Sequence, residues 1–214
     1  MNIFVLGLRV TDTAQKQDGL VNVITENLPS SDKRVATSVQ LIQKEGSYAG
    51  NILEQLQDQQ NILAIGPTKP TVDGILKMQP MLVITEDNFS DALVMNCFIA
   101  TGGLGPKAEE VELADNTVTN RSIAWQDENK ETQWFKLTAW GDKSKQLAEL
   151  APGTPTIAVG KVSSSTKEDK QYLNYNVDKI QYLPKGSKPT PKKAADPDRG
   201  KVAAAALGAV DFNL

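Results

Sequence analysis

Two tryptophans and a lysine alternate along one short apolar segment, residues 133–140. Successive side chains of a β-strand point to opposite faces of the sheet, so every second residue shares a face. One face would carry four side chains: Trp134, Lys136, Thr138 and Trp140. The other would carry three residues expected in a hydrophobic core: Phe135, Leu137 and Ala139. This spacing therefore predicts a strand that leaves two indole rings on the outside of the sheet.

Indole rings on a surface need an explanation, because large exposed apolar groups usually mark an interaction site. Base stacking is one explanation, since every nucleobase has a π-face and each stacked base contributes about 1–3 kcal/mol. A lysine between the rings could then contact phosphate. The alternative is packing against the other half of the chain or a second subunit, because tryptophan is enriched in such interfaces.

Two further residues of the preceding segment leave alternatives open. Alternation places Trp125 with Ile123, so it is either a core residue at the end of the sheet or a ligand contact. Arg121 shares this parity, and an unpaired guanidinium cannot lie in a core. Arg121 would either turn outward and contact phosphate, or form a surface ion pair with Glu128 or Glu131.

Enzymatic chemistry is poorly supported by the residue types. The chain has no histidine, which removes the commonest general base and the usual nucleophile pairs. Cys97 is the single cysteine, so no intrachain disulfide forms, and a reducing cytoplasm is favoured. Cys97 itself is expected to be a small core residue. We therefore expect a protein without catalytic residues, cofactor or metal.

Two motifs superficially suggest ligand sites. The glycine-rich segment 102–107 lacks the pattern and helix start of a phosphate-binding loop, so we interpret it as a turn between strands. An acidic cluster follows at Glu109, Glu110 and Glu112. Magnesium binding is conceivable there, but a solvated loop is the favoured interpretation.

An internal repeat organises the chain. A shift of 94 positions aligns Met1-Asn2 with Met95-Asn96, and it brings the segment 63–66 onto 157–160 without a gap. Coincidence between two unrelated β-rich domains is the alternative. We predict two similar domains, residues 1–94 and 95–184, followed by a tail, residues 185–214.

Each copy shows the same expected order of elements. Strands are predicted at residues 3–8, 20–25 and 34–43 in the first copy, and at 97–100, 117–125 and 133–140 in the second. A helix follows, capped by Ser47 in copy one and by Asp142 or Ser144 in copy two. Two strands end each copy, at 62–66 and 81–85, and at 157–162 and 172–183. The prediction is an all-β chain with one short helix per domain, folded as two tandem OB-fold barrels with a flexible C-terminal tail.

The charge is spread unevenly over these segments. The net charge is −3 overall, −4 for residues 1–94, −2 for 95–184 and +3 for 185–214. An acidic body argues against tight nonspecific binding of duplex nucleic acid, but it leaves stacking of single strands open. No apolar run approaches the length of a membrane span, and the N-terminus does not resemble a signal peptide. We expect no membrane partner.

Five segments of the second copy share a pattern with one protein family: 96–105, 131–141 (ETQWFKLTAWG), 147–153, 159–161 and 178–183. Together they resemble bacterial single-stranded DNA-binding proteins. The resemblance implies an OB-fold that wraps single-stranded DNA in replication, recombination or repair, with Trp134 and Trp140 at base-stacking positions. Members with two OB-folds per chain assemble as homodimers with four OB-folds, which the repeat makes the expected state here.

The remaining candidates follow from the same resemblance. Lys161 joins the candidate nucleic-acid contacts. The family usually has an aromatic residue in the loop after the fourth strand, whereas segment 163–166 is Ser-Ser-Ser-Thr. The acidic tip that recruits replication or repair proteins is reduced to Asp211 and Phe212. Copy one has no tryptophan and is not expected to be a stacking platform.

The sequence thus predicts a non-enzymatic, cytoplasmic, nucleoid-associated protein that binds and protects single-stranded DNA. An OB-fold interaction protein or RNA-binding protein with weak or no affinity for single-stranded DNA is the main alternative. A nuclease that uses the acidic cluster is a distant third.

Overall fold

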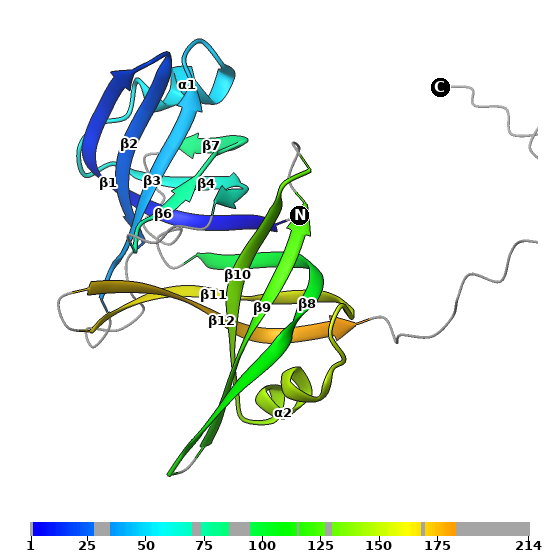
Figure 1. Ribbon diagram of the computed structural model, residues 1–214. Helices are drawn as coiled ribbons and strands as arrows, with labels where there is room; N and C mark the ends of the chain where they lie inside the picture. Colours follow the sequence, from blue (N-terminus) through cyan, green and yellow to red (C-terminus); the bar gives the residue numbers. More distant parts are fainter. Residues whose placement is uncertain are drawn as a thin grey trace, which may run out of the picture. The chain divides into compact units, whose positions relative to one another are not determined.

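The computed structural model describes residues 2–27, 35–69, 74–85, 95–114, 116–126, 130–167 and 170–182 (Figure 1). The N-terminal part contains β1 (Asn2–Gln17), β2 (Leu20–Asn27), β3 (Thr37–Lys44), α1 (Tyr48–Leu53), β4 (Asn61–Gly66), β5 (Thr68–Lys69), β6 (Leu76–Met78) and β7 (Leu82–Thr85). The C-terminal part contains β8 (Asn96–Leu113), β9 (Asn116–Gln126), β10 (Thr132–Trp140), α2 (Asp142–Glu149), β11 (Pro155–Lys167) and β12 (Lys170–Tyr182). The predicted order of three strands, a helix and two strands is confirmed in the C-terminal part, whereas the N-terminal part has two further short strands, β5 and β6, after β4.

The strands β8 to β12 close into a barrel, which we call the C-terminal barrel. β8 pairs with β9, and β9 pairs with β10, both antiparallel. β10 then pairs in parallel with β12, β12 with β11, and β11 again with β8. Since no strand edge is left at the seam, the barrel holds its curvature without a partner sheet.

The strands β1 to β7 form a second barrel, which we call the N-terminal barrel. It follows the same path as the C-terminal barrel, but β4 and β5 take the place of its fourth strand, and β6 and β7 take the place of its fifth. β3 pairs in parallel with β6, β6 with β5, and β4 with both β1 and β7. The sequence did not predict β5 and β6. At Gly66, where β4 ends, a Cβ atom would lie 2.3 Å from the carbonyl oxygen of Gln79, so glycine permits this close approach of the backbone.

Strand register repeats between the barrels with the 94-residue offset found in the sequence. Phe4 lies opposite Gly66 in the N-terminal barrel, and Phe98 lies opposite Gly160 in the C-terminal barrel. The offset fails in the last strand, however. Ala64 pairs with Val83, whereas its counterpart Ala158 pairs with Ile180 and not with Val177.

The barrels are joined through their first strands. β1 and β8 pair antiparallel from Asn2–Ala100 to Leu6–Asn96. The Asn2 side chain makes two hydrogen bonds to the backbone of Thr68: Nδ2 donates to the carbonyl oxygen at 3.2 Å, and Oδ1 accepts from the amide at 2.9 Å. Asn96 bonds the backbone of Val162 in the same way, at 2.7 and 2.9 Å. Each pair is displaced by 94 residues, so the junction is built as a local two-fold.

The core spans this junction. The rings of Phe4 and Phe98 stack with centroids 5.7 Å apart, and Tyr175 contacts both of them edge-on. Burial raises the pKa of the Tyr175 hydroxyl. Cys97 was expected in this core, but it lies half-buried on the opposite face of β8, because its neighbour Phe98 takes the inward position.

The first strands are longer than predicted, and this corrects the interpretation of the glycine-rich segment. Residues 102–105 are not a turn between strands; they lie inside β8. Gly103 pairs with both Pro155 of β11 and Ala124 of β9, so the strand changes neighbours here. A Cβ atom at Gly102 would lie 2.0 Å from the carbonyl oxygen of Ala124, which explains why glycine is needed at this corner.

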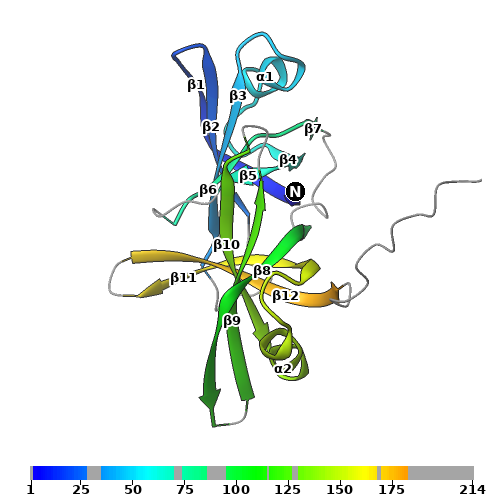
Figure 2. The ribbon, with the colours of Figure 1, turned by 45° about the vertical axis from the view of Figure 1, so that its right-hand side comes forward.

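The two helices begin differently. The predicted cap of α1 is confirmed, since the Ser47 hydroxyl accepts a hydrogen bond from the Gly50 amide at 3.0 Å. The predicted caps of α2 are wrong. Gly141 precedes its first turn with a positive φ of 60°, and Ser144 is buried with its hydroxyl 2.7 Å from that of Thr119. Figure 2 shows α2 beside the base of the β8–β9 hairpin.

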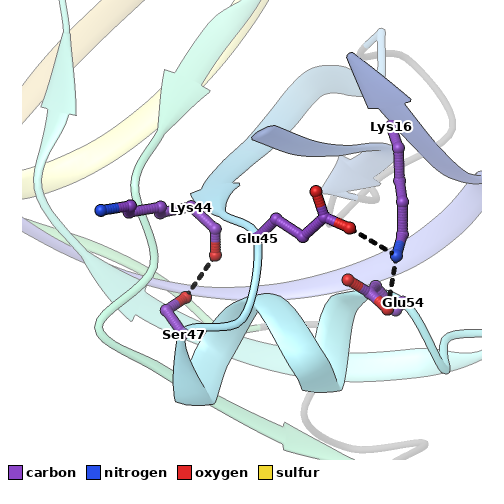
Figure 3. A network of polar contacts seen from close by, with 5 residues as sticks. All are labelled: Lys16, Lys44, Glu45, Ser47 and Glu54. Atoms are coloured by element: carbon purple, nitrogen blue, oxygen red, sulfur yellow. Dashed lines mark hydrogen bonds and ion pairs between the residues drawn. The ribbon is translucent and has the colours of Figure 1, made fainter. Parts of the chain in front are cut away.

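A polar network holds α1 to the end of the β1–β2 hairpin (Figure 3). Lys16 Nζ lies 3.0 Å from Glu45 Oε1 and 2.9 Å from Glu54 Oε2. The hydrogen bond to Glu54, more than any other contact, raises the pKa of Lys16. Among the described residues, neither helix has the length and apolar character needed to cross a membrane.

Substitution of Gly160 by alanine tests the close approach between β11 and β12. The added Cβ atom would lie 1.9 Å from the carbonyl oxygen of Asn176, so the backbone must shift. We expect Gly160→Ala to lower the unfolding free energy by about 1–3 kcal/mol, measured by urea or thermal unfolding. Gly103→Ala is the matched control, because its Cβ would meet its nearest atom at 3.7 Å. Equal stability of the two variants would contradict this packing.

Candidate nucleic-acid interface

The outward face of β10 carries both indole rings, as the alternation predicts. Trp134 and Trp140 are 47% and 45% exposed, whereas Phe135, Leu137 and Ala139 are buried. The orientation of β10 is set by its core residues, because Leu137 and Ala139 are buried in the barrel interior and the tryptophans must then face outward. The alternative that the indoles are packed away within the chain is therefore wrong for the described residues.

Lys136 lies between the two tryptophans, and its ammonium group is paired. Nζ lies 2.5 Å from Oε2 of Glu109, which comes from β8, two strands away. Both side chains are more than half exposed. The hydrogen bond from Lys136 is the main cause that lowers the pKa of Glu109, so the carboxylate is ionised at neutral pH.

Thr138 shares the outward register but is not free. It is only 9% exposed, and its hydroxyl donates a hydrogen bond to Asn120 Oδ1 at 2.9 Å. Its neighbour across the parallel seam is Asn176 of β12, whose Oδ1 also lies 3.4 Å from Trp140 Nε1. Thr138 can therefore hold the Asn120 side chain in place, but little of the Thr138 side chain is accessible to a ligand.

The seam carries the outward face onto the β11–β12 hairpin. From Asn176, the alternation on β12 leads to Asn174 and Tyr172. The partners directly opposite on β11 are Lys161, Ser163 and Ser165. Nδ2 of Asn176 and Nδ2 of Asn174 donate to the hydroxyls of Ser163 and Ser165, each at 2.9 Å. The predicted residue Lys161 thus lies on the same face as Trp140, and it is exposed.

Tyr172 is a candidate that sequence reasoning missed. It is 47% exposed and lies opposite Ser165 on this face. The sequence shows an aromatic residue just after the Ser-Ser-Ser-Thr segment, but only the register of β10 against β12 reveals which face it shares. We call the outward face of Trp134, Lys136, Trp140, Lys161, Tyr172, Asn174 and Asn176 the platform.

Trp125 packs against the hydrophobic core, as the first of its two alternatives predicts. Its ring meets Phe135 edge-on with centroids 4.9 Å apart, and it packs against the hydrophobic core while staying partly buried.

Both alternatives for Arg121 are wrong. Its side chain is 2% exposed, and its guanidinium donates to backbone carbonyls on two sides. Nε and Nη2 bond Gly105 O at 3.1 and 3.0 Å, while Nη1 bonds Leu147 O at 2.7 Å and Leu150 O at 2.5 Å. The carbonyls that end α2 have no helical donor, so Arg121 satisfies them from inside the barrel. It is not available to phosphate.

The equivalent face of the N-terminal barrel has a different chemistry. The outward residues of β3 are Ser38, Gln40, Ile42 and Lys44, without an aromatic ring. Gln40 contacts Asn22 of β2, with Nε2 and Oδ1 3.4 Å apart. These β3 residues offer hydroxyl, amide, aliphatic and ammonium groups, which lack the flat aromatic surface that stacks on bases.

The part of the chain that the structure describes holds no cluster of metal-ligating side chains. No group of three or more histidine, cysteine, aspartate or glutamate side chains converges there as metal ligands would. Of the acidic cluster, Glu109 is committed to Lys136. Asp211 and Phe212, predicted to recruit partners, lie outside the described residues.

Comparison with known proteins identifies the architecture. No protein-family model and no curated protein matches the sequence. Among solved structures, the wild-type single-stranded DNA binding protein from Thermus aquaticus aligns with a TM-score of 0.66 at 14% identity, over 87% of this chain and 94% of that chain. A deletion mutant of that protein aligns with a TM-score of 0.67 at 14% identity, over 89% and 98%.

The chain shares the two-barrel fold of that protein. The predicted all-β fold of two tandem OB-folds, with one helix each, is confirmed by this likeness and by the closed strand order. At this level of identity, the comparison concerns the fold, and the roles of individual residues depend on the geometry described above.

Replacement of Arg121 tests its structural role. Arg121→Met would leave the carbonyls of Gly105, Leu147 and Leu150 without their buried donor. We expect a loss of about 1–3 kcal/mol of unfolding free energy, measured by thermal or urea unfolding. Arg121→Lys should lose an intermediate amount, because one ammonium cannot span both sides. A fully stable Arg121→Met variant would contradict this assignment.

Proposed function

We propose that this protein binds single-stranded DNA, without enzymatic activity, through the platform of the C-terminal barrel. The observation that carries the proposal is the pair of exposed indole rings of Trp134 and Trp140, with Lys136 between them. Single strands present the unstacked base faces that such rings bind, whereas duplex DNA hides them. The acidic body of the chain also disfavours binding through phosphate contacts alone.

The spacing of the rings sets the binding mode. Trp140 lies six positions after Trp134, and a strand rises about 3.3 Å per residue, so their Cα atoms are roughly 20 Å apart. Bases stacked on the two rings belong to nucleotides that are not neighbours in the strand. Lys136 would contact a phosphate between them.

The strand would continue from Trp140 over the seam onto the β11–β12 hairpin. Asn176 and Asn174 offer amide oxygens to base amino groups, and Tyr172 offers another ring. Lys161 lies one strand further and would contact phosphate. Thr138 and Trp125 would support the platform from below, through Asn120 and Phe135.

The hairpin also touches the N-terminal barrel. The hydroxyls of Ser164 and Thr37 lie 3.3 Å apart, and Gln171 Nε2 lies 3.4 Å from Ala36 O. Because these contacts anchor the hairpin near the start of β3, a strand that passes Tyr172 would be led toward the N-terminal barrel. That barrel would guide the strand weakly, since the outward residues of β3 include no aromatic ring.

A homodimer with four OB-folds is proposed as the assembly. The sheet that joins the barrels turns an aliphatic face outward: Ile3, Val5, Ile65, Leu82, Ile99, Ile157 and Val159. Ile99 and Ile157 are more than 40% exposed. A contiguous apolar face of this kind needs a cover, and a second copy would cover the same face on both subunits by two-fold symmetry.

The cellular role follows from this binding. A protein of this kind would protect exposed single strands during replication, recombination or repair, in the cytoplasm beside the nucleoid. Recruitment of replication or repair proteins through Asp211 and Phe212 stays a prediction from the sequence.

Titration with oligo-dT tests the binding function. Indole emission should be quenched at low salt, with an affinity that falls as salt rises. Trp134→Ala and Trp140→Ala should each lose about 1–3 kcal/mol of binding free energy, measured by fluorescence anisotropy, with Tyr172→Ala losing a comparable amount.

Tyr48→Ala is the matched control, since Tyr48 is an exposed aromatic residue of α1, outside the platform. It should bind like the parent. Absence of quenching, or parental affinity of both tryptophan variants, would remove the proposal. Tighter binding of oligo-rU than of oligo-dT would favour the RNA-binding alternative.

Light scattering tests the assembly. We expect about twice the chain mass of 23.2 kDa. The double variant Ile99→Asp with Ile157→Asp should be monomeric, because a carboxylate in an apolar interface is costly. Leu20→Asp, which changes an exposed leucine of β2 outside this face, should stay dimeric. A monomeric parent at micromolar concentration would refute the assembly.

A further inference from the structure

Lys136, the basic residue of β10, is already paired with a carboxylate in the free protein. Lys136 Nζ contacts Glu109 Oε2 across the intervening strand β9, above the Thr138–Asn120 pair. Both side chains stay more than half exposed, so the pair is open to exchange with ligands and salt. Glu109 reaches the ammonium from β8, where it lies opposite Asn120 on the outward face.

Phosphate and Glu109 need the same donor. An ammonium group has three donors but a single compact charge, and its attraction to one anion falls when another already occupies it. A phosphate that approaches Lys136 must displace the Glu109 carboxylate or share the ammonium with it. In either case the carboxylate stays close to the phosphate and repels it.

We propose that Glu109 is an internal competitor for the DNA phosphate, which limits the affinity of the platform and speeds release of the strand. The inference rests on the proposed function, because it concerns the same site. Glu109 acts through Lys136 and is therefore a positioning residue. Stacking on Trp134 and Trp140 then supplies most of the binding energy, with the lysine contributing less than an unpaired cation would.

The fold explains why Glu109 is placed there. β8 continues past the point where it leaves β11, and its second half pairs with β9 alone as a hairpin that extends beyond the barrel. Figure 2 shows this hairpin projecting away from the remaining strands. Its outward residues Glu109 and Val111 consequently extend the surface that begins at β10, and Val111 lies opposite Val118, itself the partner of Trp140.

The test compares two variants with the same change of net charge. Glu109→Gln removes the competitor, whereas Glu110→Gln removes the neighbouring carboxylate that points to the other side of the strand and is also exposed. Binding of oligo-dT is measured by anisotropy between low and moderate salt, with dissociation rates by stopped flow. We expect Glu109→Gln to bind on the order of two- to fivefold tighter than Glu110→Gln, mainly through slower dissociation.

Salt dependence gives a readout that a structural effect would not change. Freed from Glu109, Lys136 should contribute a full phosphate contact, so the salt slope of Glu109→Gln should steepen by up to about 0.7 relative to Glu110→Gln. In a Lys136→Gln background, the advantage of Glu109→Gln should disappear. Lys136→Gln should also weaken binding more in the Glu109→Gln chain than in the parent.

Two outcomes separate this inference from the proposed function. If the parent binds oligo-dT and loses affinity in the tryptophan variants, yet Glu109→Gln and Glu110→Gln bind equally, Glu109 is not a competitor. If the advantage of Glu109→Gln persists without Lys136, the effect is general charge repulsion, and the inference is overturned. A parent that does not bind would instead refute the proposed function.

Discussion

The structure depends on the two-residue periodicity of one strand, β10, whose inward residues are indispensable to the core. Leu137 and Ala139 are fully buried, and Phe135 joins Phe98 and Tyr175 in the aromatic cluster. Since neighbouring side chains must face opposite ways, this burial forces Trp134 and Trp140 into water. A one-residue slip would bury two indoles and a lysine, at a large cost in desolvation. The proposed binding surface is thus a consequence of how the barrel is packed.

The parallel seam between β10 and β12 extends this surface beyond one strand. It sets Asn176 beside Thr138, and from there the hairpin brings Lys161 and Tyr172 onto the same side. The same hairpin contacts the N-terminal barrel through Ser164 and Gln171. The β11–β12 hairpin therefore has three roles: it closes the C-terminal barrel, contacts the N-terminal barrel and extends the platform. The two copies differ at this strand, because β10 carries two exposed indole rings and its counterpart β3 carries no aromatic ring.

Electrostatics works against the platform as much as for it. Lys136, the cation between the two tryptophans, is paired with Glu109, and Lys16 is paired with Glu45 and Glu54. Arg121, the one arginine of the C-terminal barrel, serves the carbonyls at the end of α2. Such a protein would favour ligands that offer exposed base faces over ligands that offer only charge.

The sequence by itself determined the strand order of the C-terminal barrel, the 94-residue repeat of the first and fourth strands, the helix cap at Ser47 and the outward position of the two tryptophans. These features can be predicted because they depend on the local pattern of apolar residues and on hydrogen bonds between residues close in sequence. Only the tertiary structure decided that residues 102–105 continue β8, that Arg121 is buried, that Glu109 holds Lys136 and that Tyr172 joins the platform. Each of these depends on which residues face each other across strands distant in sequence, and pairing register between such strands is set by the packing of the whole barrel.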